Sequence, residues 1–147
     1  MKVPYHRQEF PWSCFAACVK MVLEFIGIKK VEKDLRPLLR VTPYVGGSWY
    51  YAELGLESLG LHFYWSYGFS LEELKELIKG ETPIVVSLRF ESGKEYHLNH
   101  TVVVTDVTDD FIIVHDPERD ENMRIGVKHF SELWSNRRNL AGYIKKV

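Results

Sequence analysis

The segment CFAACVKMVLEFI, residues 14–26, is the feature of the sequence that most constrains the fold. Its only charged residues are Lys20 and Glu24, which are four residues apart and therefore lie on one side of a helix. A helix with one narrow polar strip has to be covered on nearly all its other sides. Gly27 follows, and glycine commonly ends helices. The sequence therefore predicts a central, nearly buried helix over residues 14–26.

The remaining segments predict helices first and strands later. Further helices are expected over residues 31–40, 51–59, 70–80 and 129–136, and Ser70 and Glu73 form a capping box at the start of the third of these. Strands are expected over residues 61–67, 83–90, 100–107, 110–117, 123–127 and 140–147, the last at an edge of the sheet. This order is typical of an α+β fold. With 147 residues, the chain is expected to form a single domain over 1–147.

Composition excludes several classes of partner. The net charge of −1 gives no reason to expect binding to nucleic acid or to an anionic membrane. No apolar stretch is long enough to span a membrane. Residues 1–12 contain charges and proline instead of an apolar signal segment, which favours the cytoplasm. The two cysteines are four residues apart on one helix, where a disulfide would be strained, so both are expected to be free thiols.

Cys14 is the candidate nucleophile because it begins the predicted helix, behind Ser13 as a possible N-cap. The unpaired N–H groups and the dipole at a helix N-terminus favour an anion and lower the pKa of a thiol there. Cys18 lies one turn further in and is interpreted as a core residue. A cysteine on an apolar helix is more often packing than chemistry, so Cys14 needs partners to count as a nucleophile.

A thiolate nucleophile needs a base, and the base needs a group that orients it. His100 begins the strand HTVVVTDV, and Asp116 ends the strand DFIIVHDP. If the turn between the strands holds three residues, Asp116 lies opposite Val102 and diagonal to His100, on the same face and roughly 7–8 Å away. A two-residue turn puts the two side chains on opposite faces unless a bulge intervenes. His115 points to the other face and is the weaker candidate base.

Gln8 is the fourth member of this set. An acyl-transfer site needs hydrogen-bond donors for the developing oxyanion, and the Gln8 amide with the backbone N–H of Cys14 could supply two. Each residue also has an ordinary interpretation: an exposed loop amide for Gln8, a carbonyl-bonded histidine for His100, and a turn-forming Asp-Pro for Asp116. Taken together, the four residues favour a thiol hydrolase of peptide or amide bonds.

The same segments resemble papain-like cysteine peptidases, in particular the group of bacteriocin-leader-processing peptidase domains and their stand-alone relatives. In that group a Gln precedes the nucleophilic Cys by six residues, as in QEFPWSC, and a His opens a Val-rich strand, as in NHTVVVTDV. An Asp-Pro ends the next strand, as in FIIVHDP, and a terminal helix carries an aromatic residue and a Trp, as in HFSELW. The resemblance implies a papain-like fold with the central helix packed on an antiparallel sheet. It also implies a Cys14–His100–Asp116 triad, Gln8 as oxyanion donor and a peptide substrate.

The sequence departs from that group in two ways. Phe15 follows the nucleophile where such peptidases usually have Gly, and its ring could narrow the site or reshape the oxyanion region. Bacteriocin-processing domains are also commonly fused to membrane exporters, and this chain has no such part. The resemblance therefore implies the fold and the reaction type better than it implies a double-glycine leader as substrate.

Two alternatives to a hydrolase stay open. Cys14, Cys18, His97 and His100 include the ligand types of a zinc site, but an extended 97–100 segment would point its two histidines to opposite faces. We therefore expect no metal and no cofactor. The second alternative, motivated by Phe15, is a catalytically inactive peptide-binding or regulatory module with the same fold.

Two further predictions concern the surroundings of the site. Most of an aromatic set is expected to be core and wall packing, with part of it available to line a substrate cleft: Trp49, Tyr50, Tyr51, Phe63, Tyr64, Trp65 and Tyr67. The loop over residues 90–99, which immediately precedes His100, is expected to border the active site and to be mobile.

Overall fold

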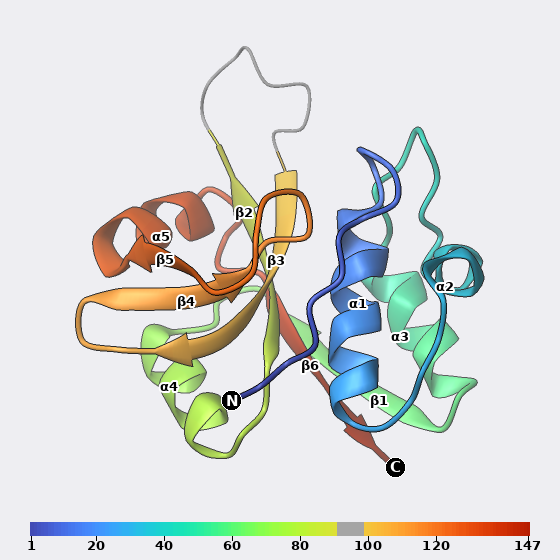
Figure 1. The fold of residues 1–147 in the computed structure, drawn as a ribbon, viewed down its shortest axis with the longest axis horizontal. Coiled ribbons are helices and arrows are strands. Elements are labelled where there is room, and N and C mark those ends of the chain that lie inside the picture. Colours follow the sequence, from blue (N-terminus) through green and yellow to red (C-terminus); the bar gives the residue numbers. More distant parts are fainter. Residues whose placement is uncertain (91–98) are drawn as a thin grey trace.

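The computed structural model describes residues 1–90 and 99–147. These residues form an antiparallel sheet in the order β1-β6-β2-β3-β4-β5 (Figure 1). The predicted mobile loop lies outside the described residues except for its two ends, Phe90 and Asn99. The strands are β1 (Leu61–Ser66), β2 (Ile84–Arg89), β3 (Asn99–Val107), β4 (Phe111–His115), β5 (Met123–Gly126) and β6 (Ala141–Lys146).

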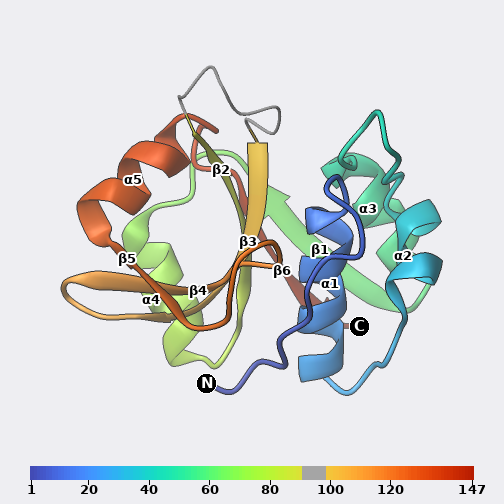
Figure 2. The same ribbon diagram turned by 45° about the horizontal axis from the view of Figure 1, so that its top comes forward.

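Helices cover both sides of this sheet (Figures 1 and 2). The helices α1 (Cys14–Phe25), α2 (Glu32–Leu38) and α3 (Trp49–Glu57) gather on one side, and α4 (Leu71–Lys79) and α5 (Val127–Ser135) on the other. Each of these elements was predicted from the sequence, with bounds that shift by no more than two residues. The α+β class and the central helix packed on an antiparallel sheet are therefore confirmed.

Helix α1 is buried to the extent that its composition predicts. Eight of its twelve residues are buried, whereas Lys20 and Glu24 remain partly exposed. Gly27 adopts a φ of +91° directly after the helix, a conformation that favours glycine. Ser13 occupies the N-cap position, but its hydroxyl bonds to the backbone of Phe10 instead of to a helix amide.

Strands β2 and β3 are apolar on both faces because each face meets a different core. Val85 and Val103 pack in the cluster that surrounds α1, α2 and α3. Their neighbours Val86 and Val102 pack in the cluster with α4 and α5. This explains why the two strands read as continuous apolar runs instead of alternating patterns.

The hairpin of β3 and β4 reaches the predicted register by a different route. Val107 pairs with Ile112, which leaves a two-residue turn at Asp109 and Asp110, so of the two alternatives the three-residue turn is wrong and the two-residue turn is the one observed. A β-bulge between Val104 and Asp106 then shifts the pairing by one residue. Beyond the bulge the pairing returns to the register that puts His100 and Asp116 on one face.

Strand β6 does not lie at an edge of the sheet, contrary to the prediction. It pairs with β1 along Leu61–Ser66 and with β2 at Ala141 and Gly142. The charged residues Lys145 and Lys146, typical of an edge strand, lie beyond the part that β2 covers. The edges are instead formed by β1 and β5.

The helix termini follow their sequence signals in part. The capping box of Ser70 and Glu73 is confirmed, since each side chain bonds to the backbone N–H of the other residue.

Among the described residues, none of the helices combines the length and apolar character that crossing a bilayer requires.

Candidate active site

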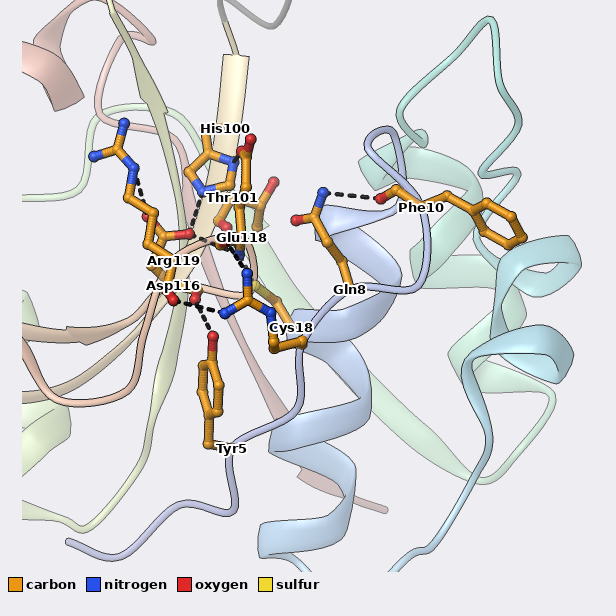
Figure 3. A network of polar contacts seen from close by, with 10 residues as sticks. Tyr5, Gln8, Phe10, Cys18, His100, Thr101, Asp116, Glu118 and Arg119 are labelled. Carbon is orange, nitrogen blue, oxygen red and sulfur yellow. Dashed lines mark hydrogen bonds and ion pairs between the residues drawn. The ribbon is translucent and has the colours of Figure 1, made fainter.

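The first contact of the site joins the two strand ends singled out in the sequence. The Nε2 atom of His100 lies 2.6 Å from Oδ1 of Asp116, and both side chains are buried (Figure 3). The same Oδ1 atom accepts the backbone N–H of Glu118 at 2.9 Å. The backbone of Asp116 is held by Asp120 and by the hydroxyl of Tyr5. These contacts hold the Asp116 carboxylate in position beside the His100 imidazole.

The contacts of His100 favour its protonated form. Burial disfavours the imidazolium, but the hydrogen bond with Asp116, the interaction with Cys14 and the negative charges of both raise the pKa of His100 to about 10. Because Nε2 faces Asp116, Nδ1 is the ring nitrogen left for Cys14. A second carboxylate, that of the half-exposed Glu118, lies 3.7 Å from Nδ1.

The two thiols of α1 have opposite electrostatic environments. Burial alone would raise the pKa of Cys14, but interactions with His100 and Thr101 outweigh it and lower the pKa. Burial raises the pKa of Cys18 well above its ordinary value, and the charges of Cys14 and Asp116 add to this effect. The Cys18 thiol donates to the backbone oxygen of Thr101 at 3.3 Å. Both thiols are free, and Cys18 behaves as a core residue.

Gln8 lies on the segment before α1, and its side-chain amide is held by the backbone. Its Nε2 atom donates to the backbone oxygen of Phe10 at 2.9 Å (Figure 3). The Oε1 atom is buried and has no hydrogen-bond partner within the described residues. One of the two Nε2 hydrogens therefore remains unused. The backbone N–H of Cys14, at the first position of α1, also has no partner inside the helix.

A pocket of about 390 Å³ opens beside Cys14. Phe15 belongs to its wall: the ring is buried, stacks on Trp49 at a centroid distance of 5.0 Å and lies under Gly47. A Cβ atom on Gly47 would come within 2.6 Å of the Phe15 ring, and this glycine has a φ of +125°. Phe15 is therefore accommodated by a glycine in the facing loop.

Both ring nitrogens of His115 are engaged by backbone groups. One ring nitrogen of His115 bonds to the backbone oxygen of Val3 and the other accepts the N–H of Asn122, so this histidine joins chain segments.

His97, which the zinc alternative requires, lies outside the described residues. Within residues 1–90 and 99–147, no group of three or more potential ligand side chains converges on a metal site.

The prediction for the aromatic set is wrong in part. Trp49 lines the pocket and Phe63 is buried, but the tyrosines of the set, at positions 50, 51, 64 and 67, are 44–53% exposed. On the edge strand β1 the burial alternates, so Phe63 faces the core and Tyr64 the solvent.

Three residues near the site were not singled out in the sequence. Thr101 contacts both thiols, Glu118 faces His100, and Arg137 lines the pocket from the turn after α5. Thr101 follows a candidate base, but strand alternation assigns it to the opposite face. Arg137 stands next to Arg138 in a polar turn, and no sequence signal distinguishes the two.

Comparisons with known proteins identify the family and the fold. The description "Peptidase C39 like family" belongs to a family whose model matches residues 1–142. No curated protein sequence matches the chain. Among solved structures, a putative C39-like peptidase from Bacillus anthracis is similar, with 17% identity, a TM-score of 0.77, and coverage of 99% of this chain and 96% of that one.

Two further solved structures are peptidase domains of transporters. A double glycine motif protease from an AMS/PCAT transporter, in complex with the leader peptide, has 21% identity, a TM-score of 0.79, and coverage of 99% and 93%. The peptidase domain of Streptococcus ComA, a bifunctional ABC transporter of a quorum-sensing pathway, has 17% identity, a TM-score of 0.80, and coverage of 99% and 100%. These structures share the fold of a cysteine peptidase with this protein. Since the family match extends over nearly the whole sequence, the chain belongs to the Peptidase C39-like family.

Proposed function

We propose that the protein is a cysteine peptidase or amide hydrolase that acts on a peptide substrate. In this proposal Cys14 is the nucleophile, His100 the general base and acid, and Asp116 the group that orients the imidazole. The observation that carries the proposal is that Asp116 binds Nε2 of His100 while interactions with Cys14 help to raise the pKa of the same ring. Such an arrangement favours a thiolate beside an imidazolium.

The reaction follows from these positions. The Cys14 thiolate attacks the carbonyl carbon, a C–S bond forms, and the carbonyl oxygen becomes an oxyanion. The free hydrogen on Nε2 of Gln8 and the N–H of Cys14 are the proposed donors to this oxyanion. His100 gives its proton to the leaving amine as the C–N bond breaks, then takes a proton from the water that hydrolyses the thioester. The carboxylic acid product leaves, and the thiolate and imidazolium are restored.

Alkylation by iodoacetamide tests the activated nucleophile directly. At neutral pH Cys14 should react faster than a free model thiol, and His100→Ala should slow the reaction. Cys18 is an internal control, because it has no exposed surface and its pKa is raised. If Cys14 reacts no faster than the model thiol, and His100→Ala changes nothing, Cys14 is not activated and the proposal fails.

The two carboxylates beside His100 provide a matched pair of variants. Asp116→Asn should lower peptide turnover by at least about a hundredfold, because the imidazole loses its buried partner. Glu118→Gln should stay within about fivefold of the wild type, because this carboxylate is half exposed and 3.7 Å away. Equal effects of the two variants would contradict the role proposed for Asp116.

The inactive-module alternative requires peptide binding without turnover. Phe15, which motivated it, packs against Trp49 and beneath Gly47, so its ring is part of the pocket wall. Peptide binding that survives Cys14→Ala, with no turnover by the wild type, would favour the alternative.

We also propose that residues 1–147 act as one peptidase unit. The cytoplasmic location stays a prediction.

A further inference from the structure

The pocket beside Cys14 has two chemically different walls. One wall is aromatic and contains Trp12, Phe15 and Trp49. The other is polar and comes from the sheet side, with Ser87, Thr101 and Arg137. A peptide bound against Cys14 would therefore place neighbouring groups within reach of a guanidinium.

Arg137 is held in the pocket by a single side-chain hydrogen bond. Its Nε atom donates to the hydroxyl of the buried Ser87 at 2.9 Å, and its backbone N–H donates to Trp134. The Ser87 bond fixes one edge of the guanidinium plane. The four N–H groups on the two Nη atoms have no hydrogen-bond partner among the described residues.

The charges around Arg137 do not neutralise it. In the described part of the chain, no carboxylate lies within 4.0 Å of its guanidinium, and another arginine, Arg89, contributes a repulsive charge. Burial lowers the pKa of Arg137; the nearby Tyr67 hydroxyl opposes this shift, and the charge of Arg89 adds to it. By contrast, the guanidinium of Arg36 lies 3.6 Å from both Glu9 and Glu32. A partly desolvated guanidinium without an acidic partner is costly unless a ligand supplies the anion.

We propose that Arg137 binds a carboxylate of the peptide substrate, so that the enzyme selects acidic substrates. This inference rests on the proposed function. The planar guanidinium, positioned by Ser87, presents donors that match a carboxylate in a two-bond arrangement. The carboxylate is either an Asp or Glu side chain close to the scissile bond or the C-terminal carboxylate of a short substrate.

Peptide pairs distinguish these two sources. One pair differs by Glu or Gln at a single position near the scissile bond, and the other by a free or an amidated C-terminus. For one of the two pairs, wild-type kcat/KM should favour the carboxylate peptide by about ten- to hundredfold, as expected for a charge-assisted contact. In Arg137→Gln the preference should disappear through a loss on the carboxylate peptide alone. Arg138→Gln is the control, because Arg138 packs over Tyr67 instead of lining the pocket.

Two measurements separate a failure of this inference from a failure of the proposed function. Arg137→Gln should leave the alkylation rate of Cys14 unchanged, because alkylation needs no substrate carboxylate. If the wild type turns over no peptide, binding of both peptide pairs to Cys14→Ala can be followed by the fluorescence of Trp12 and Trp49, which line the pocket. Binding that is tighter for the carboxylate peptide and is lost in Arg137→Gln supports the inference without any turnover. Equal losses on both members of each pair, or no preference in the wild type, would overturn it.

Discussion

Two thiols one helical turn apart show how strongly the ionisation of a cysteine depends on its contacts. Cys14 and Cys18 share one helix, and burial raises the pKa of each. Only Cys14 has an imidazole beside it, and its interactions with His100 and Thr101 together reverse the direction of the shift. The helix N-terminus adds to this effect at Cys14, and its field weakens by the next turn. Position on the helix and contact with His100 therefore act together.

Gln8 gives a prediction at the scale of one residue. If its free Nε2 hydrogen donates to the oxyanion, Gln8→Ala should lower kcat for peptide hydrolysis by about 10²–10³-fold. Alkylation of Cys14 by iodoacetamide should change little, because that reaction forms no oxyanion. Comparing the two rates in the same variant separates oxyanion stabilisation from activation of the thiol.

The isosteric variant Gln8→Glu is the control for shape. A carboxylate cannot donate a hydrogen bond and repels an oxyanion, so turnover should fall at least as far as in Gln8→Ala. Full turnover in Gln8→Ala would return Gln8 to its ordinary interpretation as a loop amide.

Some candidate site residues could be singled out from the sequence because their signals are local. Cys14 begins an apolar helix, and His100 and Asp116 stand at the ends of two consecutive strands. Arg137 had no such signal, because it lines a pocket whose walls are distant in sequence. The position of a residue within a helix or strand can be predicted from the sequence, whereas contacts between loops that are far apart in the sequence cannot.

At the scale of elements, the β3–β4 hairpin shows the limit of register arguments. The turn holds two residues, and the bulge before Asp106 shifts the pairing by one residue, which is the second of the two arrangements considered for this hairpin. Neither feature can be read from TVVVTDVTDDFIIVHD, because Thr105 and Asp106 suit both a bulge and a regular strand. Because Val102, Val103 and Val104 are all buried, apolar character does not mark one face of β3 and does not fix the register from the sequence.

Strand order was also beyond the reach of the sequence. The lysines near the end of β6 are typical of an edge strand, but β1 and β2 flank the apolar part of β6. Gly142 allows this placement, since a Cβ there would come within 2.6 Å of Phe63. The close approach of two strands is set by partners far along the chain.

The contact between α2 and α3 gives a prediction at this scale. Alanine normally stabilises a helix interior over glycine by about 1 kcal/mol. At Gly55 in α3, however, a Cβ would lie 2.3 Å from the backbone oxygen of Leu38 in α2, so the two helices would have to separate. We expect Gly55→Ala to lower the free energy of unfolding by about 1–3 kcal/mol, measured by urea unfolding.

Gly80→Ala is the matched control for this prediction. Gly80 follows α4 with a φ of −83°, and the nearest atom to its Cβ would be 3.5 Å away. This variant should be neutral or slightly stabilising. If Gly55→Ala were as stable as Gly80→Ala, close packing of α2 on α3 would not be what requires glycine at position 55.

At the scale of the whole molecule, the candidate site depends on both layers of the fold. Cys14 comes from the helical side, and His100 and Asp116 come from the sheet. The order of helices and strands predicted the α+β class, since each element carries its own periodicity. The contact of α1 with β3 brings the two halves of the site together, through the cluster that contains Phe15 and Val103.

The ionisation of Cys14 and His100 should appear in the stability of the entire protein. Folding raises the pKa of His100 from 6.5 to about 10, so its contribution to the free energy of unfolding is complete below pH 6.5 and is lost as the pH rises to about 10. Folding lowers the pKa of Cys14 from 9.0, so its contribution is complete above pH 9.0 and is lost as the pH falls through the lowered value.

Between pH 6.5 and pH 9.0 the contribution of His100 falls as the pH rises, while that of Cys14 rises once the pH passes its lowered pKa, so the two offset each other. Cys14→Ser removes one of them, while Asp116 still raises the pKa of His100. This variant should therefore lose stability as the pH rises from 6.5, and its deficit relative to the wild type should grow up to pH 9.0. Urea unfolding of both proteins across this range measures the deficit, and groups that titrate alike in both proteins cancel from it. A deficit that does not change with pH would mean that Cys14 keeps its proton in the folded protein, and the proposed thiolate would be ruled out.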